Sequence, residues 1–200
     1  MTGLQTYDHK LVTAGCDEAG RGCLAGPVFA AAVILAPGFE NEEVNDSKKL
    51  TFRKRQMLSE VIQRDAVTWG IGIADPSEID ELNILNASIL AMHRALDELS
   101  VRPEFIIVDG NRFHSYHEIP YSCIIKGDSR FIEIAAASIL AKCLRDEYML
   151  KLHQEYPSYG WDANKGYPAP GHIEALLQHG TTPHHRKTFH VKRQLPFPST

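Results

Sequence analysis

The sequence contains few cysteines, and they form no recognisable pairs. No CxxC spacing occurs among the four, which are Cys16, Cys23, Cys123 and Cys143. In a chain without an export signal we expect such cysteines to be free thiols. Their spacing excludes a disulfide framework, and the ten histidines lack the cysteine partners and the spacing of a zinc finger.

Long apolar stretches and a secretory leader are also missing. No run of residues is apolar and uncharged over enough length to cross a bilayer. Residues 1–10 lack the basic region and the apolar core of a secretory signal. We therefore expect a cytoplasmic protein without a membrane-spanning segment.

Charge of one sign does not dominate the chain. The formal net charge is −4 at pH 7, which argues weakly against binding to nucleic acid. Acidic residues outnumber basic ones over residues 1–139, and basic residues outnumber acidic ones over residues 140–200. An acidic body could hold cations and a basic end could hold phosphates, although an ordinary solvated surface explains the pattern more simply.

Hydrophobic patterning predicts a β-hairpin followed by alternating helices and strands. Strands are predicted over residues 11–16, 27–35, 67–73, 105–108 and 123–125. Helices are predicted over residues 51–64, 76–99, 131–152 and 172–178. For 200 residues this order predicts one α/β domain, a mixed sheet flanked by helices with a C-terminal helical segment.

Acidic side chains stand where three predicted strands end. Asp17 and Glu18 close the first strand, Asp109 follows the fourth and Asp128 follows the fifth. Sheets of α/β proteins present their chemistry at strand ends, and strands about 5 Å apart let carboxylates share a metal. Magnesium and manganese prefer such oxygen ligands, and two ions about 4 Å apart can stabilise phosphodiester cleavage.

Each of these acids also has a purely structural interpretation. Asp109 opens an Asp-Gly-Asn sequence, which is typical of a turn, and Asp128 could cap the helix that follows it. Taken alone, each acid favours the structural interpretation. Their joint position at three strand ends favours a catalytic site.

A glycine-rich turn, residues 17–27, joins the two strands of the hairpin. A strand is predicted to follow it, whereas a dinucleotide-binding loop requires a helix, so a nicotinamide oxidoreductase is disfavoured. Glycines beside an acidic pair let the backbone approach a substrate closely, and Arg21 could bind a phosphate or a sugar. A plain hairpin turn is the alternative.

Seven short motifs span roughly residues 12–190. They are CDEAGRGCLAGPV from Cys16, DSKKL from Asp46, VDGN from Val108, KGD from Lys126, IAAASILAK from Ile134, YPSYGW from Tyr156 and KGY from Lys165. In this order they resemble bacterial ribonuclease HII, of the type 2 ribonuclease H family. One motif could arise by chance, whereas seven in the order of the family do not plausibly do so.

The resemblance implies an RNase H-like fold. A catalytic domain would cover residues 1–155, and a basic helical substrate-binding segment, residues 156–200, would belong to the same globule. The resemblance assigns both catalysis and metal binding to Asp17, Glu18, Asp109 and Asp128. The metal would be Mn²⁺ or Mg²⁺, with two ions when substrate is bound.

The resemblance also implies how the substrate is bound. The substrate-binding residues would be Gly20, Arg21, Gly22 and Tyr167. The backbone of the first three would read the ribose 2′-hydroxyl, and the tyrosine would pack against the sugar at the RNA–DNA junction. Lys48 and Lys49 could contact phosphates or be a solvated pair before a helix. A basic end is predicted to help hold duplex through His184, His185, Arg186, Lys187, Lys192 and Arg193.

The expected activity is metal-dependent hydrolysis of the RNA strand in RNA–DNA hybrids. Cutting would also occur on the 5′ side of single ribonucleotides embedded in duplex DNA. These nucleic acids would be the partners of a monomer that needs no obligate protein partner. Two alternatives stay open, namely a nuclease of the same fold that acts on branched DNA and a hybrid-binding module without catalysis.

Overall fold

A five-stranded mixed sheet forms the centre of the protein. The computed structural model describes residues 4–8, 10–44 and 50–189. The strands are β1 (Thr13–Ala19), β2 (Val28–Leu35), β3 (Ala66–Ala74), β4 (Phe105–Asp109) and β5 (Tyr121–Ile124). Their order in the sheet is β3-β2-β1-β4-β5. The pairs β1–β2 and β2–β3 are antiparallel, and β1–β4 and β4–β5 are parallel.

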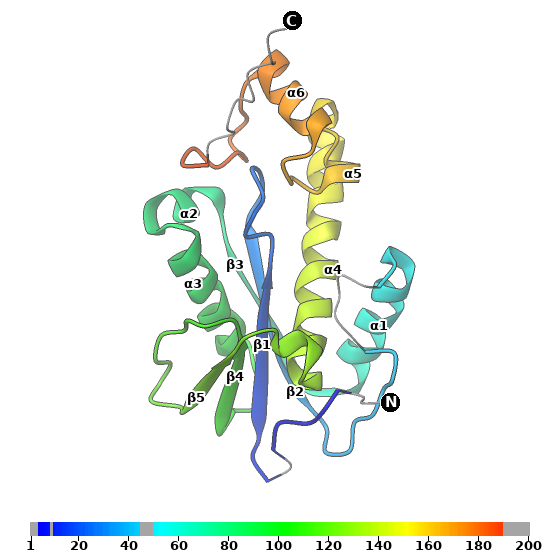
Figure 1. The fold of residues 1–200 in the computed structure, drawn as a ribbon, viewed down its shortest axis with the longest axis vertical. Helices are drawn as coiled ribbons and strands as arrows, with labels where there is room; N and C mark the ends of the chain where they lie inside the picture. The colour runs from blue at the N-terminus through cyan, green and yellow to red at the C-terminus, as the bar shows by residue number, and fades with distance from the viewer. Residues whose placement is uncertain (1–3, 9, 45–49, 190–200) are drawn as a thin grey trace, which may run out of the picture.

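Helices cover both faces of this sheet. They are α1 (Phe52–Asp65), α2 (Pro76–Leu82), α3 (Ile84–Asp97), α4 (Ile132–Glu155), α5 (Trp161–Asn164) and α6 (Pro170–His179), with 3₁₀ turns η1 (Gly127–Ser129) and η2 (Pro157–Tyr159). Figure 1 shows α2 and α3 on one side of the sheet, α4 and α1 on the other, and α5 and α6 beyond its end. The predicted α/β sheet flanked by helices is confirmed. No helix among the described residues has the length and hydropathy needed to cross a membrane.

Alternation along β2 builds two hydrophobic cores. Ala30 and Ala32 belong to the core on the α3 side, whereas Ala31 and Val33 belong to the core on the α4 side. Because both faces of the strand are buried, its sequence is a continuous apolar run instead of an alternating one. The same alternation decides which side of the sheet each acid of β1 faces.

Glycines let the helices lie directly on the strands. A Cβ atom on Gly72 of β3 would lie 1.9 Å from the carbonyl oxygen of Ala91 in α3. One on Gly15 of β1 would lie 2.3 Å from the carbonyl carbon of Glu133 in α4. Both distances are far below van der Waals contact, so only glycine permits this packing.

Local polar bonds set the helix boundaries. Thr51 caps α1 by accepting the amide of Lys54, and Asp75 forms a capping box with Glu78 at the start of α2. The predicted helical stretch 76–99 forms two helices because Asn83 adopts a φ of 67° between them. The asparagine then caps α3 with its own side chain.

The segment after α4 packs against the last turns of that helix. Tyr159, Trp161 and Ala175 form a buried cluster with Met149 and Leu152 of α4. A single antiparallel bridge joins Ala25 of the glycine-rich turn to His185. Residues near both ends of the described chain therefore meet at one end of the sheet.

We predict that Gly15→Ala lowers the free energy of unfolding by about 3 kcal/mol, because its methyl group collides with the α4 backbone. Gly171→Ala in α6 is the control, since no heavy atom lies within 4 Å of its added methyl. The control should change stability by less than about 1 kcal/mol. Urea unfolding measures both, and equal stability of the two variants would contradict the close packing of α4 on β1.

Candidate active site

Asp17 lies two residues before the end of β1, and Asp109, the last residue of β4, lies beside it. Cys16 pairs with Val108 in a parallel register, so the next residues, Asp17 and Asp109, are lateral neighbours. Paired residues of adjacent strands point to the same face of a sheet. This face carries α4, because Gly15, two residues before Asp17, lies against the α4 backbone.

Asp17 is buried on this face and lies among negative charges. Its carboxylate accepts the amide of Glu18 at 2.7 Å and a hydrogen bond from the Ser138 side chain of α4. Burial raises the pKa of the Asp17 carboxyl well above its usual range. The charges of Glu18 and Asp109 raise this pKa further. The free protein therefore disfavours the ionised form of Asp17.

The second acid, Glu18, faces the other side of the sheet. The prediction that β1 ends at the acids is wrong, because Glu18 pairs with Ala30 of β2 and the strand continues to Ala19. Successive residues of a strand point to opposite faces. Glu18 lies in a hollow that Asp109 and Arg21 also line, and Arg21 forms a salt bridge with it at 3.0 Å.

The fourth acid, Asp128, lies in η1 and is buried. The amide of the preceding Gly127 donates to Oδ1 of Asp109 at 2.7 Å, which keeps η1 beside the end of β4. The helix after it, α4, begins only at Ile132, and its N-cap Phe131 makes no side-chain capping bond. The interpretation of Asp128 as the cap of this helix is therefore wrong.

The donors of these four residues suit a hard divalent cation. All are carboxylate oxygens, which Mg²⁺ and Mn²⁺ prefer, and a cation would relieve the repulsion felt by Asp17. Within residues 4–8, 10–44 and 50–189, no three His, Cys, Asp or Glu side chains form a ready-made metal site. Magnesium commonly binds one or two carboxylates and completes its shell with water and phosphate.

Two buried arginines hold the glycine-rich turn that follows β1. Arg145 of α4 is 0% exposed, and Arg186 is 3% exposed. Their guanidinium groups donate to the backbone carbonyls of Gly20, Arg21, Ala25, Gly26, Pro27 and Lys165. The prediction that Arg186 and His185 help hold duplex is wrong, because both side chains are buried. Lys192 and Arg193 lie outside the described residues.

Tyr167 lies beside the same turn. Its hydroxyl hydrogen-bonds with Cys23, and burial raises its pKa to about 12. The Lys142 ammonium lies 5.3 Å and the Arg145 guanidinium 5.8 Å from the centre of its ring. The residue as a whole is 38% exposed, so part of it is accessible to a ligand. Lys48 and Lys49, the other predicted substrate contacts, lie outside the described residues.

A pair of neutral histidines fixes the backbone of Tyr167. Nδ1 of His172 lies 2.9 Å from the Tyr167 carbonyl and must carry a proton to bond it. Nε2 of His172 then accepts from the Trp161 indole and from Nε2 of His185, each at 3.1 Å. Nδ1 of His185 accepts the amide of Thr182. Burial lowers the pKa of His185 to about 4, which keeps the network neutral near pH 7.

Residues 14–194 match the family described as Ribonuclease HII. The chain belongs to this family. It is 60% identical over 188 residues to a Ribonuclease HII of Bacteroides fragilis, covering 94% of each chain. As a ribonuclease HII family member it is a hydrolytic nuclease of the ribonuclease H class. The resemblance inferred from the seven motifs is confirmed.

Solved structures of the ribonuclease H class share the fold. The ribonuclease H2 of Pyrococcus horikoshii OT3 is similar with a TM-score of 0.74 and 27% identity, over 88% of this chain and 93% of that one. Bst-RNase HIII in complex with Mn²⁺ is similar with a TM-score of 0.66 and 20% identity, over 84% of this chain and 62% of that one. The expected RNase H-like fold is confirmed.

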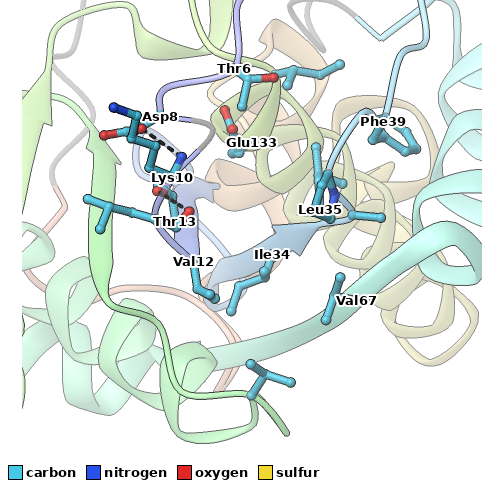
Figure 2. Close-up of a pocket in the computed structure, with 15 residues that line it drawn as sticks. Thr6, Asp8, Lys10, Val12, Thr13, Ile34, Leu35, Phe39, Val67 and Glu133 are labelled. Atoms are coloured by element: carbon cyan, nitrogen blue, oxygen red, sulfur yellow. Dashed lines mark hydrogen bonds between the residues drawn. The ribbon is translucent and has the colours of Figure 1, made fainter.

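A separate pocket of this ribonuclease HII lies at the opposite end of β1. It encloses about 350 Å³ and is lined mainly by apolar side chains, including Val12, Ile34 and Phe39. Figure 2 shows Asp8 and Glu133 at its edge. Asp8 accepts the amide of Lys10 and Glu133 accepts the amide of Tyr7, and the acids of the candidate site lie toward the far end of β1.

Sequence reasoning missed three residues that shape this ribonuclease HII site. Ser138 lies in a run of small residues that predicts only close packing, and its bond to Asp17 has no sequence signal. Arg145 lies in a predicted helix between Leu144 and Asp146, and this setting does not signal its burial. Arg186 lies in the basic stretch that was predicted to help hold duplex, and that prediction concealed its burial.

We predict that Asp17→Asn stabilises the metal-free protein near neutral pH, because it removes a buried charge that Glu18 and Asp109 repel. The raised pKa of Asp17 makes this gain absent below about pH 4, where the carboxyl is protonated in both states, and larger as the pH rises. Thermal unfolding in EDTA at several pH values measures the effect. A lower melting temperature of the variant at neutral pH would contradict the repulsion. Asp65→Asn, an exposed acid at the end of α1, is the control.

Proposed function

We propose that this ribonuclease H cuts the RNA strand of RNA–DNA hybrids and also cuts 5′ of single ribonucleotides embedded in duplex DNA, with divalent metal ions. The observation that carries the proposal is the parallel pairing of Cys16 with Val108, which brings the next residues, Asp17 and Asp109, beside each other. The first glycine of the turn is Gly20, two residues after Glu18. A carboxylate site and a backbone suited to contact sugars therefore adjoin on one strand.

The metal ligands in this proposal are Asp17, Glu18, Asp109 and Asp128. Asp17 adjoins Glu18 in the chain and Asp109 across the sheet, so it is the acid best suited to contact two cations. Bound divalent ions supply a water of lowered pKa and positive charge for the phosphate. The Mn²⁺ complex of Bst-RNase HIII, a protein of similar fold, supports the use of such ions.

Recognition of the ribose would use backbone amides. Arg21 and Gly22 are exposed, and their amides donate to no backbone carbonyl in the described part of the chain. An amide can donate to the 2′-hydroxyl, which RNA has and DNA lacks. Tyr167 offers a partly exposed ring against which the sugar can pack. Sensing the ribose this close to Glu18 would bring the neighbouring phosphate to the acids.

We predict that Asp109→Asn reduces cleavage of a DNA duplex containing one ribonucleotide by more than about a hundredfold, in Mg²⁺ or Mn²⁺. The amide keeps the oxygen that accepts the Gly127 amide, so folding and duplex binding should survive. Cleavage is followed on a denaturing gel, and binding by fluorescence anisotropy in EDTA. Asp65→Asn, which leaves the site untouched, should cleave normally.

Unchanged cutting by Asp109→Asn would refute the catalytic assignment. The same assay on an all-DNA four-way junction tests the alternative substrate. Efficient junction cleavage that needs no ribonucleotide would favour a branched-DNA nuclease over the proposed function. Tight binding of hybrid with no metal-dependent cleavage would favour a binding module.

We predict that Tyr167→Ala slows cleavage at a single ribonucleotide by about tenfold to a hundredfold, because an aromatic contact with a nucleotide contributes about 1–3 kcal/mol. Tyr167→Phe keeps the ring and loses only the hydrogen bond to Cys23, so it should cleave at nearly the wild-type rate. Single-turnover kinetics separate the two variants. If the phenylalanine variant is as slow as the alanine variant, the hydroxyl and not the ring is what matters.

A further inference from the structure

Arg186 contacts two consecutive peptide units of the glycine-rich turn. Its Nη2 atom donates to the carbonyl of Gly20 at 2.7 Å, and its Nη1 atom donates to the carbonyl of Arg21 at 2.8 Å. The guanidinium is buried beneath the turn, so both carbonyls point into the protein. Nε and Nη2 also donate to the carbonyl of Gly26, at 3.0 and 2.9 Å.

The direction of these carbonyls fixes the direction of two amides. In a trans peptide the N–H points opposite to the C=O, and no peptide bond in the described residues is cis. The carbonyl of Gly20 shares its plane with the amide of Arg21, and the carbonyl of Arg21 with the amide of Gly22. Both N–H groups must therefore point away from Arg186, on the side where Arg21 and Gly22 are exposed.

The surroundings of Arg186 keep it in this position. Its own amide donates to the carbonyl of Leu24 at 2.9 Å, and its guanidinium lies 5.0 Å from the centre of the Phe189 ring. Burial lowers its pKa to about 10, so it remains charged at neutral pH. A planar fork of five N–H donors suits several carbonyls at once, whereas a lysine offers one compact ammonium.

We propose that Arg186 is a positioning residue for ribonucleotide recognition, because it orients the two peptide planes whose amides face the sugar. The proposal rests on the function proposed above, in which the backbone of the turn reads the 2′-hydroxyl. Arg186 touches no substrate in this arrangement. It acts only by keeping the carbonyls of Gly20 and Arg21 turned inward and the amides of Arg21 and Gly22 turned outward.

Arg55 of α1 provides a control for a purely structural role. It is also buried, at 8% exposed, and its Nη1 atom donates to the backbone carbonyl of Leu50 at 3.2 Å. Leu50 lies outside the glycine-rich turn, and Arg55 has no role in the proposed site. Loss of either guanidinium should lower the melting temperature, whereas only loss of Arg186 should affect recognition of the ribose.

The test compares Arg186→Lys with Arg55→Lys in a binding assay. Dissociation constants are measured by fluorescence anisotropy in EDTA for a duplex DNA with one ribonucleotide and for the same duplex made only of DNA. The ratio of the two constants reports recognition of the 2′-hydroxyl. Arg186→Lys should reduce the wild-type ratio by about tenfold, the effect of one or two misaligned hydrogen bonds. Arg55→Lys should keep the ratio within about twofold.

The outcomes separate this inference from the function on which it rests. A wild-type protein without preference for the ribonucleotide duplex would refute the amide reading of the sugar. If the wild type prefers the ribonucleotide duplex and Arg186→Lys keeps that preference, the positioning role of Arg186 is overturned while the proposed function stands. The same holds if both variants lose the preference equally. Cleavage of the ribonucleotide duplex should fall in parallel with the ratio.

Amide hydrogen exchange gives a second measurement that needs no variant. The amides of Arg21 and Gly22 should exchange rapidly in the free protein, because both point to solvent. They should become protected on addition of the ribonucleotide duplex and not of the all-DNA duplex. Slow exchange of both amides in the free protein would overturn the inference even if Arg186→Lys does not fold.

Discussion

Cys16 and Val108 lie opposite each other in the parallel pair β1–β4, and this register determines where the acids meet. Shifting either strand by one residue would turn Asp17 or Asp109 to the other face of the sheet. The register is held from both sides, because β1 also pairs with β2, and Gly15 admits the backbone of α4 at a distance no other residue allows. The apolar packing of the whole sheet thus decides the position of two carboxylates.

Placing the Asp17 carboxylate there destabilises the metal-free protein, and two hydrogen bonds reduce this destabilisation. Asp17 is buried near two other negative charges, which raises its pKa, and its ionised form is accommodated by bonds from Ser138 and the Glu18 amide. Arg145 and Arg186, the buried arginines beside the turn, bond backbone carbonyls, and neither is among the groups that shift the pKa of Asp17. Buried cations and acids therefore serve separate tasks at the same end of the sheet.

Much of the fold could be predicted from the sequence, because the spacing of apolar residues and the acids that follow apolar runs can be read from short segments of the chain. The hairpin, the helix α4 and the position of Asp109 at the end of β4 were predicted from them. The end of β1 was not predicted correctly, because Glu18 is still paired with Ala30 of β2. A polar side chain does not reveal that the backbone of its residue is still hydrogen-bonded within the sheet. The partners of Arg186 are 160–166 residues away in the chain, and no local pattern encodes such a bond.

The chain order links the proposed sugar-contacting turn to the placement of the acids. Only Ala19 separates Glu18 from Gly20, so any rotation of the turn also rotates the end of β1. Gly20 has a φ of 96°, and a Cβ there would lie 2.0 Å from Nε of Arg145, which leaves the backbone little freedom to relax. Arg186 then fixes the outer half of the turn from a segment far along the chain. Arg186, which follows α6, is therefore a structural determinant of the turn, although its side chain is buried behind it.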